Sequence, residues 1–242
     1  LRRYDYSITA FPSNKWQHNL FAFFIGARRR ITHSYSFAKI RTLSFLQNDK
    51  VQSIEGIHDV EQNLKLLEPL GIGDNITIPE PFFHLLDEDK KFAEEFWNKK
   101  KLTGKFVIGM HPGGDKRYAY KRWDKESFVC LIEKLIDEKN AKVLLFTGPD
   151  EERYVESIHE KLSNDKEVCL IKRTELKKVA SLISKCNCFV CSDSGLGHIA
   201  AALGVMTLAI MGPTIHTRIS PYGKHASIVR TSIVCSPCLK YP

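Results

Sequence analysis

The feature that most constrains the fold is a regular alternation of short apolar runs and amphipathic segments from Lys105 onward. The apolar runs predict strands at 106–110, 142–146, 168–171, 188–191 and 206–210. Segments of helical periodicity lie between them, at 124–139, 151–162, 174–184 and 197–203. Strands that alternate with helices over short connections predict a parallel sheet with helices on both faces, so we expect a Rossmann-like α/β domain here.

The first 95 residues follow a different pattern, and we expect them to form part of a second domain and a linker. The predicted elements are strands at 6–10 and 28–31 and helices at 16–25, 58–70 and 87–101. The apolar residues of 16–25 fit a buried helix, whereas 32–53 is polar and is expected to be loop or irregular helix. We therefore divide the chain into domains 1–95 and 96–242.

Positive charge is concentrated in the first 48 residues. The whole chain has a net charge of +8, from 36 basic and 28 acidic residues. Residues 1–48 hold eight of the basic residues against Asp5 alone, which is a net charge of +7. This segment is either a surface for an anionic or phosphorylated partner or an ordinary solvated surface.

Composition excludes several classes of protein. With 43% hydrophobic and 26% charged residues over 242 positions, the chain can bury real cores and is not disordered as a whole. No apolar run is long enough for a membrane-spanning helix. The chain begins with Leu1 rather than methionine and shows no signal peptide, so we expect a fragment.

Seven cysteines, an odd number, make a disulfide framework improbable and favour a reducing compartment. Cys235 and Cys238 form the one C-x-x-C pair, which alone is weak evidence for a metal or redox site. The alternative is a loop that happens to carry two thiols, and the sequence leaves the role of this pair open.

Ligands of such sheets bind where the strands end, so the residues there are the first candidates for a site. His111-Pro112-Gly113-Gly114 follows the first strand, and Lys121-Arg122 lies shortly after it. Paired glycines let backbone N–H groups approach an anion, and a nearby lysine would stabilise a diphosphate. The alternative is a plain turn.

Two more strand ends carry polar residues. Asp150 follows the second strand, where it could cap a helix or bind ribose. The run 192–202 follows the fourth strand and makes a tight turn into a helix, which is a second place for a phosphate. Within it Asp193 could be an N-cap and His198 an interior histidine, and the absence of a G-x-S-x-G elbow argues against a hydrolase.

Together these motifs resemble glycosyltransferase family 9, the lipopolysaccharide heptosyltransferases. The resemblance is strong over about 105–242 and looser before that. The motifs that carry it are His111-Pro112-Gly113-Gly114, Lys121-Arg122-Trp123, the runs 146–152 and 192–201, Gly212-Pro213-Thr214, Pro221-Tyr222-Gly223 and Cys235-Ser236-Pro237-Cys238.

The resemblance implies a GT-B architecture, in which two Rossmann-like domains with parallel sheets face a cleft, the N-terminal one being incomplete here. It implies an ADP-heptose donor held by the C-terminal domain and a lipid-anchored lipopolysaccharide inner core as the acceptor. The basic segment would then suit an anionic acceptor at the inner face of the cytoplasmic membrane, so we expect a cytoplasmic, peripheral protein that binds no nucleic acid.

Site residues follow from the resemblance position by position. Lys121 matches a lysine on the donor diphosphate, Asp193 an aspartate at the donor sugar, and Ser194 and Gly195 a turn that contacts the diphosphate. Gly113 and Gly114 belong to the first turn, Thr174 aligns near the adenine and Asp150 near the ribose. His198 matches a histidine that fixes the turn.

The resemblance also marks what is missing. The family's catalytic base is an aspartate near the start of its N-terminal domain, and nothing here matches it, so we expect it upstream of residue 1. The fragment should therefore bind donor better than it turns over. In the intact protein the base would deprotonate an acceptor hydroxyl for an inverting displacement of ADP. No metal is needed, although Mg²⁺ at the diphosphate is an alternative.

Two other functions are left open. One keeps the fold but changes the donor: a transferase or epimerase that uses a UDP- or GDP-sugar. The other is a basic nucleic-acid-binding module built on Arg28-Arg29-Arg30. The sequence does not tell the nucleotide base, which heptose is added, the acceptor hydroxyl or the oligomeric state.

Overall fold

The computed structural model describes residues 4–12, 15–35, 41–72 and 79–238. The chain divides into two compact units, one comprising residues up to Pro79 together with Thr217–Ile219, and the other Glu80–His216 with the remaining residues from Ser220. Both contain parallel sheets, which confirms the expected α/β class.

The first unit is built on a three-stranded parallel sheet in the order β1-β2-β3. Its elements are β1 (Tyr6–Thr9), α1 (Trp16–Ile25), β2 (Arg29–Ser34), the 3₁₀ helix η1 (Ser44–Leu46), β3 (Asp49–Gln52), α2 (Asp59–Leu64) and the 3₁₀ helix η2 (Lys65–Leu70). A small apolar cluster packs on the sheet, formed by Ile31, Val51 and Leu66 with Leu70 beside them.

Three expectations for this unit were wrong. Residues 32–53 contain β3, which the polar sequence conceals because only Val51 of its four residues is buried. The helix expected over 58–70 changes to 3₁₀ geometry at Lys65, where Pro69 lies inside the second half and cannot donate an α-helical hydrogen bond. Gly71 does end this segment, with φ of 73°.

Helix α1 is the third difference. It was expected to be buried, but within the described residues its buried positions are Asn19 and Ala22. The side-chain nitrogen of Asn19 donates to the carbonyl of Thr42 at 2.8 Å, so this buried donor has a partner. Phe21 and Phe24 are 69% and 74% exposed. The unit therefore presents an aromatic surface on this helix.

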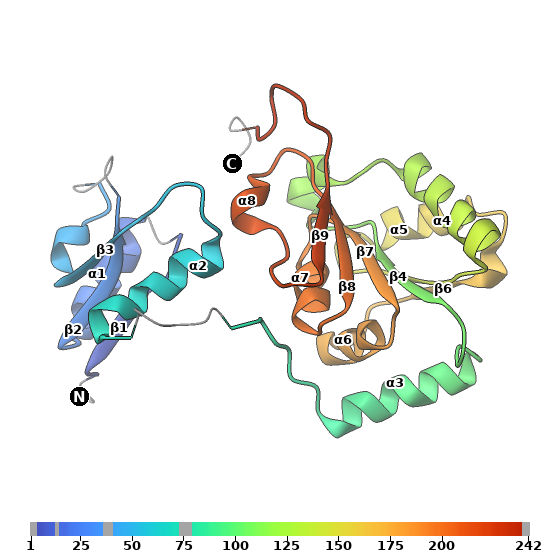
Figure 1. Ribbon diagram of the computed structural model, residues 1–242, viewed down its shortest axis with the longest axis horizontal. Helices are drawn as coiled ribbons and strands as arrows, with labels where there is room; N and C mark the ends of the chain where they lie inside the picture. The colour runs from blue at the N-terminus through green and yellow to red at the C-terminus, as the bar shows by residue number, and fades with distance from the viewer. Residues whose placement is uncertain (1–3, 13–14, 36–40, 73–78, 239–242) are drawn as a thin grey trace. The chain divides into compact units, whose positions relative to one another are not determined.

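The second unit is a six-stranded parallel sheet in the order β6-β5-β4-β7-β8-β9 (Figure 1). Its elements are α3 (Asp87–Lys99), β4 (Val107–His111), the 3₁₀ helix η3 (Lys116–Lys121), α4 (Lys125–Lys139), β5 (Lys142–Phe146), α5 (Glu152–His159), the 3₁₀ helix η4 (Asp165–Glu167), β6 (Val168–Ile171), α6 (Leu176–Ser184), β7 (Cys188–Ser192), α7 (Gly195–Ala202), β8 (Met206–Ile210), α8 (His216–Ile219, shared with the first unit) and β9 (Ala226–Val229). In the order of the strands along the chain this is the 3-2-1-4-5-6 arrangement of a Rossmann fold.

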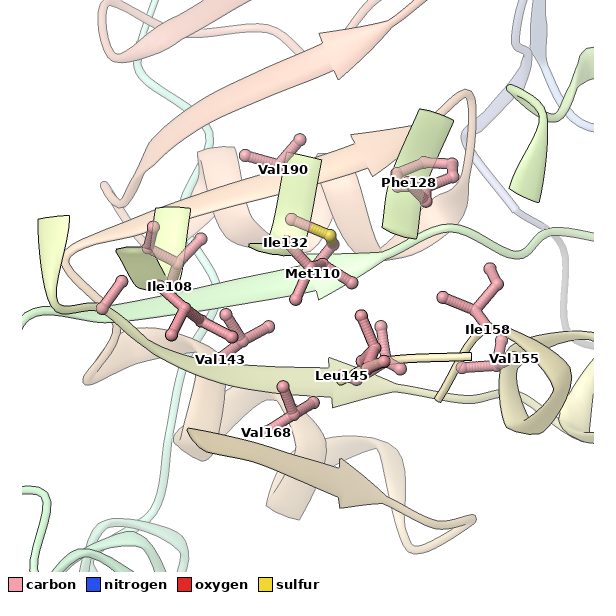
Figure 2. Close-up of a cluster of buried hydrophobic side chains, with 13 residues drawn as sticks. Ile108, Met110, Phe128, Ile132, Val143, Leu145, Val155, Ile158, Val168 and Val190 are labelled. Carbon is pink, nitrogen blue, oxygen red and sulfur yellow. The ribbon is translucent and has the colours of Figure 1, made fainter. Parts of the chain in front are cut away.

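One apolar core lies between the sheet and the two helices α4 and α5. Figure 2 shows side chains from β4, β5 and β7 meeting Phe128 and Ile132 of α4 and Val155 and Ile158 of α5. Asp124 caps α4, because its carboxylate accepts a hydrogen bond from Ser127 N–H at 3.0 Å. This core holds the carboxyl ends of β4, β5 and β7 at one edge of the sheet.

The boundary between the units differs from the predicted one. We expected it at residue 95, but it lies between Pro79 and Glu80, because α3 packs against α6 of the second unit. The charged sequence of α3 looks like that of a linker because the helix exposes most of its charged residues, but it buries Asp89, Ala93 and Trp97. Among the described residues, no helix has the length and apolar character needed to cross a membrane.

Candidate functional site

A cleft of about 760 Å³ opens in the second unit at the carboxyl ends of β4, β5 and β7. Strands β5 and β6 lie on one side of β4, and β7 to β9 lie on the other, so the order of the strands reverses between β4 and β7. Open α/β sheets bind their ligands at such a switch point. The cleft is lined by all nine residues expected to bind the donor, namely Gly113, Gly114, Lys121, Asp150, Thr174, Asp193, Ser194, Gly195 and His198. The structure thus brings together residues that are up to 85 positions apart in the sequence, from Gly113 to His198.

These nine residues differ in exposure. Asp150, Thr174, Gly195 and His198 are exposed, whereas Gly113 is buried at the base of the cleft. Gly195 begins helix α7, and Ser194 precedes it as the N-cap without a side-chain capping hydrogen bond. The first N–H groups of α7 therefore face the cleft region with the positive end of the helix dipole.

Lys121 and Asp193 form an ion pair across the cleft. Their Nζ and Oδ2 atoms are 3.2 Å apart, and the side chains are only 20% and 9% exposed. The contact lacks the alignment of a hydrogen bond, so Oδ2 of Asp193 has no hydrogen-bond donor among the described residues. Lys121 is thus paired with a largely buried carboxylate, one oxygen of which has no hydrogen bond among the described residues.

Three residues from different strand ends form a buried hydrogen-bonded chain at the base of the cleft. The carboxylate of Glu151, the N-cap of α5, lies 2.6 Å from Nε2 of His111 at the end of β4. The other ring nitrogen, Nδ1, lies 2.9 Å from Oγ of Ser194. Both His111 and Glu151 are almost fully buried, which makes these polar contacts costly to lose.

Glu151 also accepts hydrogen bonds from two glycine N–H groups. Gly114 donates to Oε2 at 2.8 Å, and Gly148 donates to Oε1 at 3.1 Å. The N–H groups of the Gly113–Gly114 turn were expected to bind a ligand anion. In the structure the anion that Gly114 N–H binds is a side chain of the protein.

The electrostatic surroundings keep Glu151 ionised. Burial raises the pKa of its carboxyl, but the hydrogen bond and charge of His111, the Gly114 N–H and the charge of Arg122 outweigh this, so the pKa lies below its ordinary value. Arg122 also donates to the carbonyl of Gly114 and stacks over the ring of Tyr154, with 4.7 Å from its Cζ to the ring centroid. Arg122 therefore stabilises the glycine turn through the carbonyl of Gly114, and Glu151 stabilises it through the N–H of the same residue.

Two residues that line the cleft, His111 and Glu151, were not among the nine expected to bind the donor. Both stand at strand ends, which is the signal that could have identified them. Asp150, one residue before Glu151, is exposed and lines the cleft, so its expected place near the ribose stays a prediction. Glu151 is buried against His111, and its side chain makes no capping hydrogen bond to α5.

The basic segment is partly committed to the fold of the first unit. Arg29 forms an ion pair with Asp49, with 2.9 Å between Nε and Oδ2, and also donates to the carbonyl of Pro69. Arg30 donates to the carbonyls of Ala27 and Leu46. Lys15, Arg28 and Arg41 are exposed, whereas Arg2, Arg3 and Lys39 lie outside the described residues.

Cys235 and Cys238 lie beside a second cavity of about 1010 Å³, between α4 and the face of β7, β8 and β9. All seven cysteines are free thiols. In the described part of the chain, no three His, Cys, Asp or Glu side chains gather as a metal site would require.

Comparison with known proteins identifies the family. The model of glycosyltransferase family 9 (heptosyltransferase) matches residues 1–242. Lipooligosaccharide heptosyltransferase 2 of Campylobacter jejuni is 32% identical over 162 residues, which cover 65% of this chain and 50% of that protein. Lipopolysaccharide heptosyltransferase 3 of Escherichia coli is 28% identical over 233 residues, covering 92% of this chain and 63% of that protein.

The fold agrees with a solved member of the family. The structure of E. coli ADP-heptose lps heptosyltransferase II superposes with a TM-score of 0.73 at 24% identity, covering 96% of this chain and 70% of that one. This likeness confirms the α/β fold with parallel sheets. The chain spans about half to two thirds of the length of the curated relatives described above. The match over all 242 residues means that the chain belongs to glycosyltransferase family 9.

Proposed function

We propose that this chain is the donor-binding part, and a portion of the acceptor-binding part, of a heptosyltransferase that moves heptose from ADP-heptose to the inner core of lipopolysaccharide with inversion. The observation that carries the proposal is the cleft at the switch point of the second unit, where Lys121, Asp193 and the start of α7 converge. Family membership and the names of the relatives support the choice of donor and acceptor.

In this proposal the side chains of the cleft stabilise the leaving group. Lys121 and the N-terminal N–H groups of α7 attract the diphosphate, and their interaction strengthens as negative charge develops on the departing ADP. Asp193, which has an unsatisfied carboxylate oxygen, accepts a hydrogen bond from a hydroxyl of the donor sugar. The ion pair of Lys121 and Asp193 keeps both side chains in place before the donor arrives.

The proton acceptor of the reaction is not supplied by these residues. The family's base aspartate has no match in this sequence, so we propose that the donor binds to this chain and that turnover needs the base from the rest of the protein. We propose that no resident metal is required, since Lys121 and α7 supply positive charge. ADP affinity should then be the same with Mg²⁺ and with a chelator.

We further propose that the first unit associates with an anionic membrane surface on the cytoplasmic side, where a lipid-anchored acceptor would lie. The exposed aromatic surface of α1, which includes Trp16, Phe21 and Phe24, suits the headgroup region of a bilayer. Lys15 and Arg28 are exposed at the two ends of that helix, and each basic residue near an anionic surface adds about 1 kcal/mol of attraction.

The donor proposal is tested by calorimetric titration of the chain with ADP, UDP and GDP, and then with ADP-heptose. We expect ADP to bind and Lys121→Ala to weaken it roughly tenfold to a hundredfold, as for the loss of one charged hydrogen bond. Lys116→Ala is the matched control, because this exposed lysine lies on the same 3₁₀ helix and does not line the cleft.

The outcomes separate the alternatives. Preference for UDP or GDP would overturn the ADP-heptose assignment and favour a transferase or epimerase of another sugar. Absence of nucleotide binding by the folded chain, together with salt-sensitive binding of random DNA, would favour the nucleic-acid alternative instead. Equal effects of Lys121→Ala and Lys116→Ala would remove Lys121 from the proposed diphosphate site.

A further inference from the structure

The buried chain Glu151–His111–Ser194 has a consequence for how the cleft binds an anion. Glu151 accepts from Gly114 and Gly148 N–H groups and lies 2.6 Å from Nε2 of His111. An ionised carboxylate can only accept hydrogen bonds, so the proton on this side of the imidazole is on Nε2. The other nitrogen, Nδ1, is therefore the one whose protonation can change.

The state of Nδ1 decides which way the hydroxyl of Ser194 points. When His111 is neutral, Nδ1 is an acceptor and Ser194 donates its hydroxyl hydrogen to it across 2.9 Å. When Nδ1 is also protonated, the imidazolium donates to Oγ of Ser194, and the hydroxyl hydrogen is released. In the first state, donation by Ser194 to a phosphate oxygen in the cleft would leave Nδ1 without a donor, whereas in the second state Ser194 can donate to the phosphate and keep its contact with His111.

We propose that Glu151 and His111 are positioning residues that link diphosphate binding in this cleft to the uptake of a proton by His111. A bound diphosphate favours the state in which Ser194 donates to it, so it favours imidazolium, and Glu151 stabilises that imidazolium from the buried side. The inference rests on the proposed function, because it takes a nucleoside diphosphate as the ligand of the cleft.

The charged groups around His111 are compatible with this linkage. Glu151 from the start of α5 is the direct partner, and Asp193 beside Ser194 adds a second negative charge. Lys121 and Arg122 from the segment after β4 oppose it, but Lys121 is paired with Asp193. Cys191 of β7, next to Ser194, stays neutral because burial raises the pKa of its thiol to about 12.

Ser194 is a suitable position for a substitution that tests the linkage. Its side chain makes no capping hydrogen bond to α7, so Ser194→Ala should leave the helix intact. Ser194→Thr retains the hydroxyl and serves as the conservative variant. Glu151→Gln removes the carboxylate that stabilises imidazolium, and Glu152→Gln removes the neighbouring charge on α5 without touching the hydrogen-bonded chain, so it is the matched control.

The experiment is titration calorimetry of the chain with ADP at one pH, in buffers that differ in ionisation enthalpy. The slope of binding enthalpy against ionisation enthalpy gives the number of protons taken up. We expect a net uptake between zero and one proton for the wild type, Ser194→Thr and Glu152→Gln. Ser194→Ala and Glu151→Gln should lose the uptake and bind ADP about tenfold more weakly.

Two failures are distinguishable. If ADP binds to the wild type with no proton uptake, or if Ser194→Ala retains it, the linkage is overturned while the donor proposal stands. If the folded wild type binds no ADP at all, the donor proposal is overturned and the linkage with it. Circular dichroism of each variant verifies that it is folded, and pyrophosphate in place of ADP shows whether the linkage belongs to the diphosphate.

Discussion

The side chain of Glu151 occupies the space that a side chain at Gly113 would need. A Cβ added at Gly113 would lie 2.6 Å from both Cγ and Cδ of Glu151, which is far inside van der Waals contact. Glu151 cannot easily move away, since its carboxylate is held by His111, Gly114 and Gly148. The neighbouring side chain of Glu151 is thus a reason for glycine at position 113.

Gly113→Ala should therefore destabilise the second unit by about 1–3 kcal/mol, the usual cost of overpacking. Urea unfolding followed by circular dichroism measures this cost. Gly212→Ala is the control, because a Cβ there meets nothing within 4 Å. In the double variant Gly113→Ala/Glu151→Ala the clash is absent. The destabilisation of the double variant should therefore be smaller than the sum of the destabilisations of the two single variants. Strict additivity would contradict the steric explanation.

The carboxylate of Glu151 should also make stability depend on pH. Its pKa is lowered in the folded protein from an ordinary value of 4.5. Its contribution to the free energy of unfolding is therefore complete above pH 4.5 and is lost as the pH falls through the lower folded value. We expect Glu151→Gln to be less stable than the wild type at pH 7, with the difference shrinking below pH 4.5. Glu152→Gln, which removes a charge of α5 outside the hydrogen bonds of His111, is the control variant.

Most strands of the second unit could be predicted from the sequence because each is a continuous apolar run, and β4, β5 and β7 are buried at nearly every position. The predicted runs 142–146, 168–171 and 206–210 agree with β5, β6 and β8 residue for residue. Strand β3 could not be found in this way, because Lys50 and Gln52 are exposed. The sequence of β3 is therefore as polar as that of a loop. The missed strand β9 pairs with β8 at the edge of its sheet and alternates between half-buried and exposed residues.

The position of the site could be predicted, but its internal chemistry could not. Because parallel strands end at one edge, residues after β4, β5 and β7 had to lie together, and all nine expected donor-binding residues line one cleft. Which acidic residue turns inward depends on the exact register between strand and helix. The contact between His111 and Glu151 spans 40 residues and leaves no periodic trace in the sequence.

The core between the sheet and α4 allows a matched comparison of two phenylalanines. Phe128 is fully buried and lies edge-on against Trp123, with ring centroids 5.1 Å apart (Figure 2 shows Phe128). Phe106, just before β4, is 43% exposed. Phe128→Ala should lower the free energy of unfolding by about 3–5 kcal/mol, and Phe106→Ala by well under half of that. Equal costs would mean that α4 does not pack as the structure has it.

Arg28 and Arg29 are neighbours with opposite expected roles. Arg29 is bound to Asp49 and to the carbonyl of Pro69, whereas Arg28, which follows the end of α1, is exposed. We expect Arg29→Ala to lower the melting temperature of the first unit, because it loosens the connection between β2, β3 and the end of η2. Arg28→Ala should leave the melting temperature unchanged and reduce sedimentation with phosphatidylglycerol vesicles. Neither variant should affect the much weaker sedimentation with pure phosphatidylcholine.

If Arg28→Ala and the wild type sediment equally with the anionic vesicles, this helix end does not contribute to membrane association, and the exposed charge is an ordinary solvated surface.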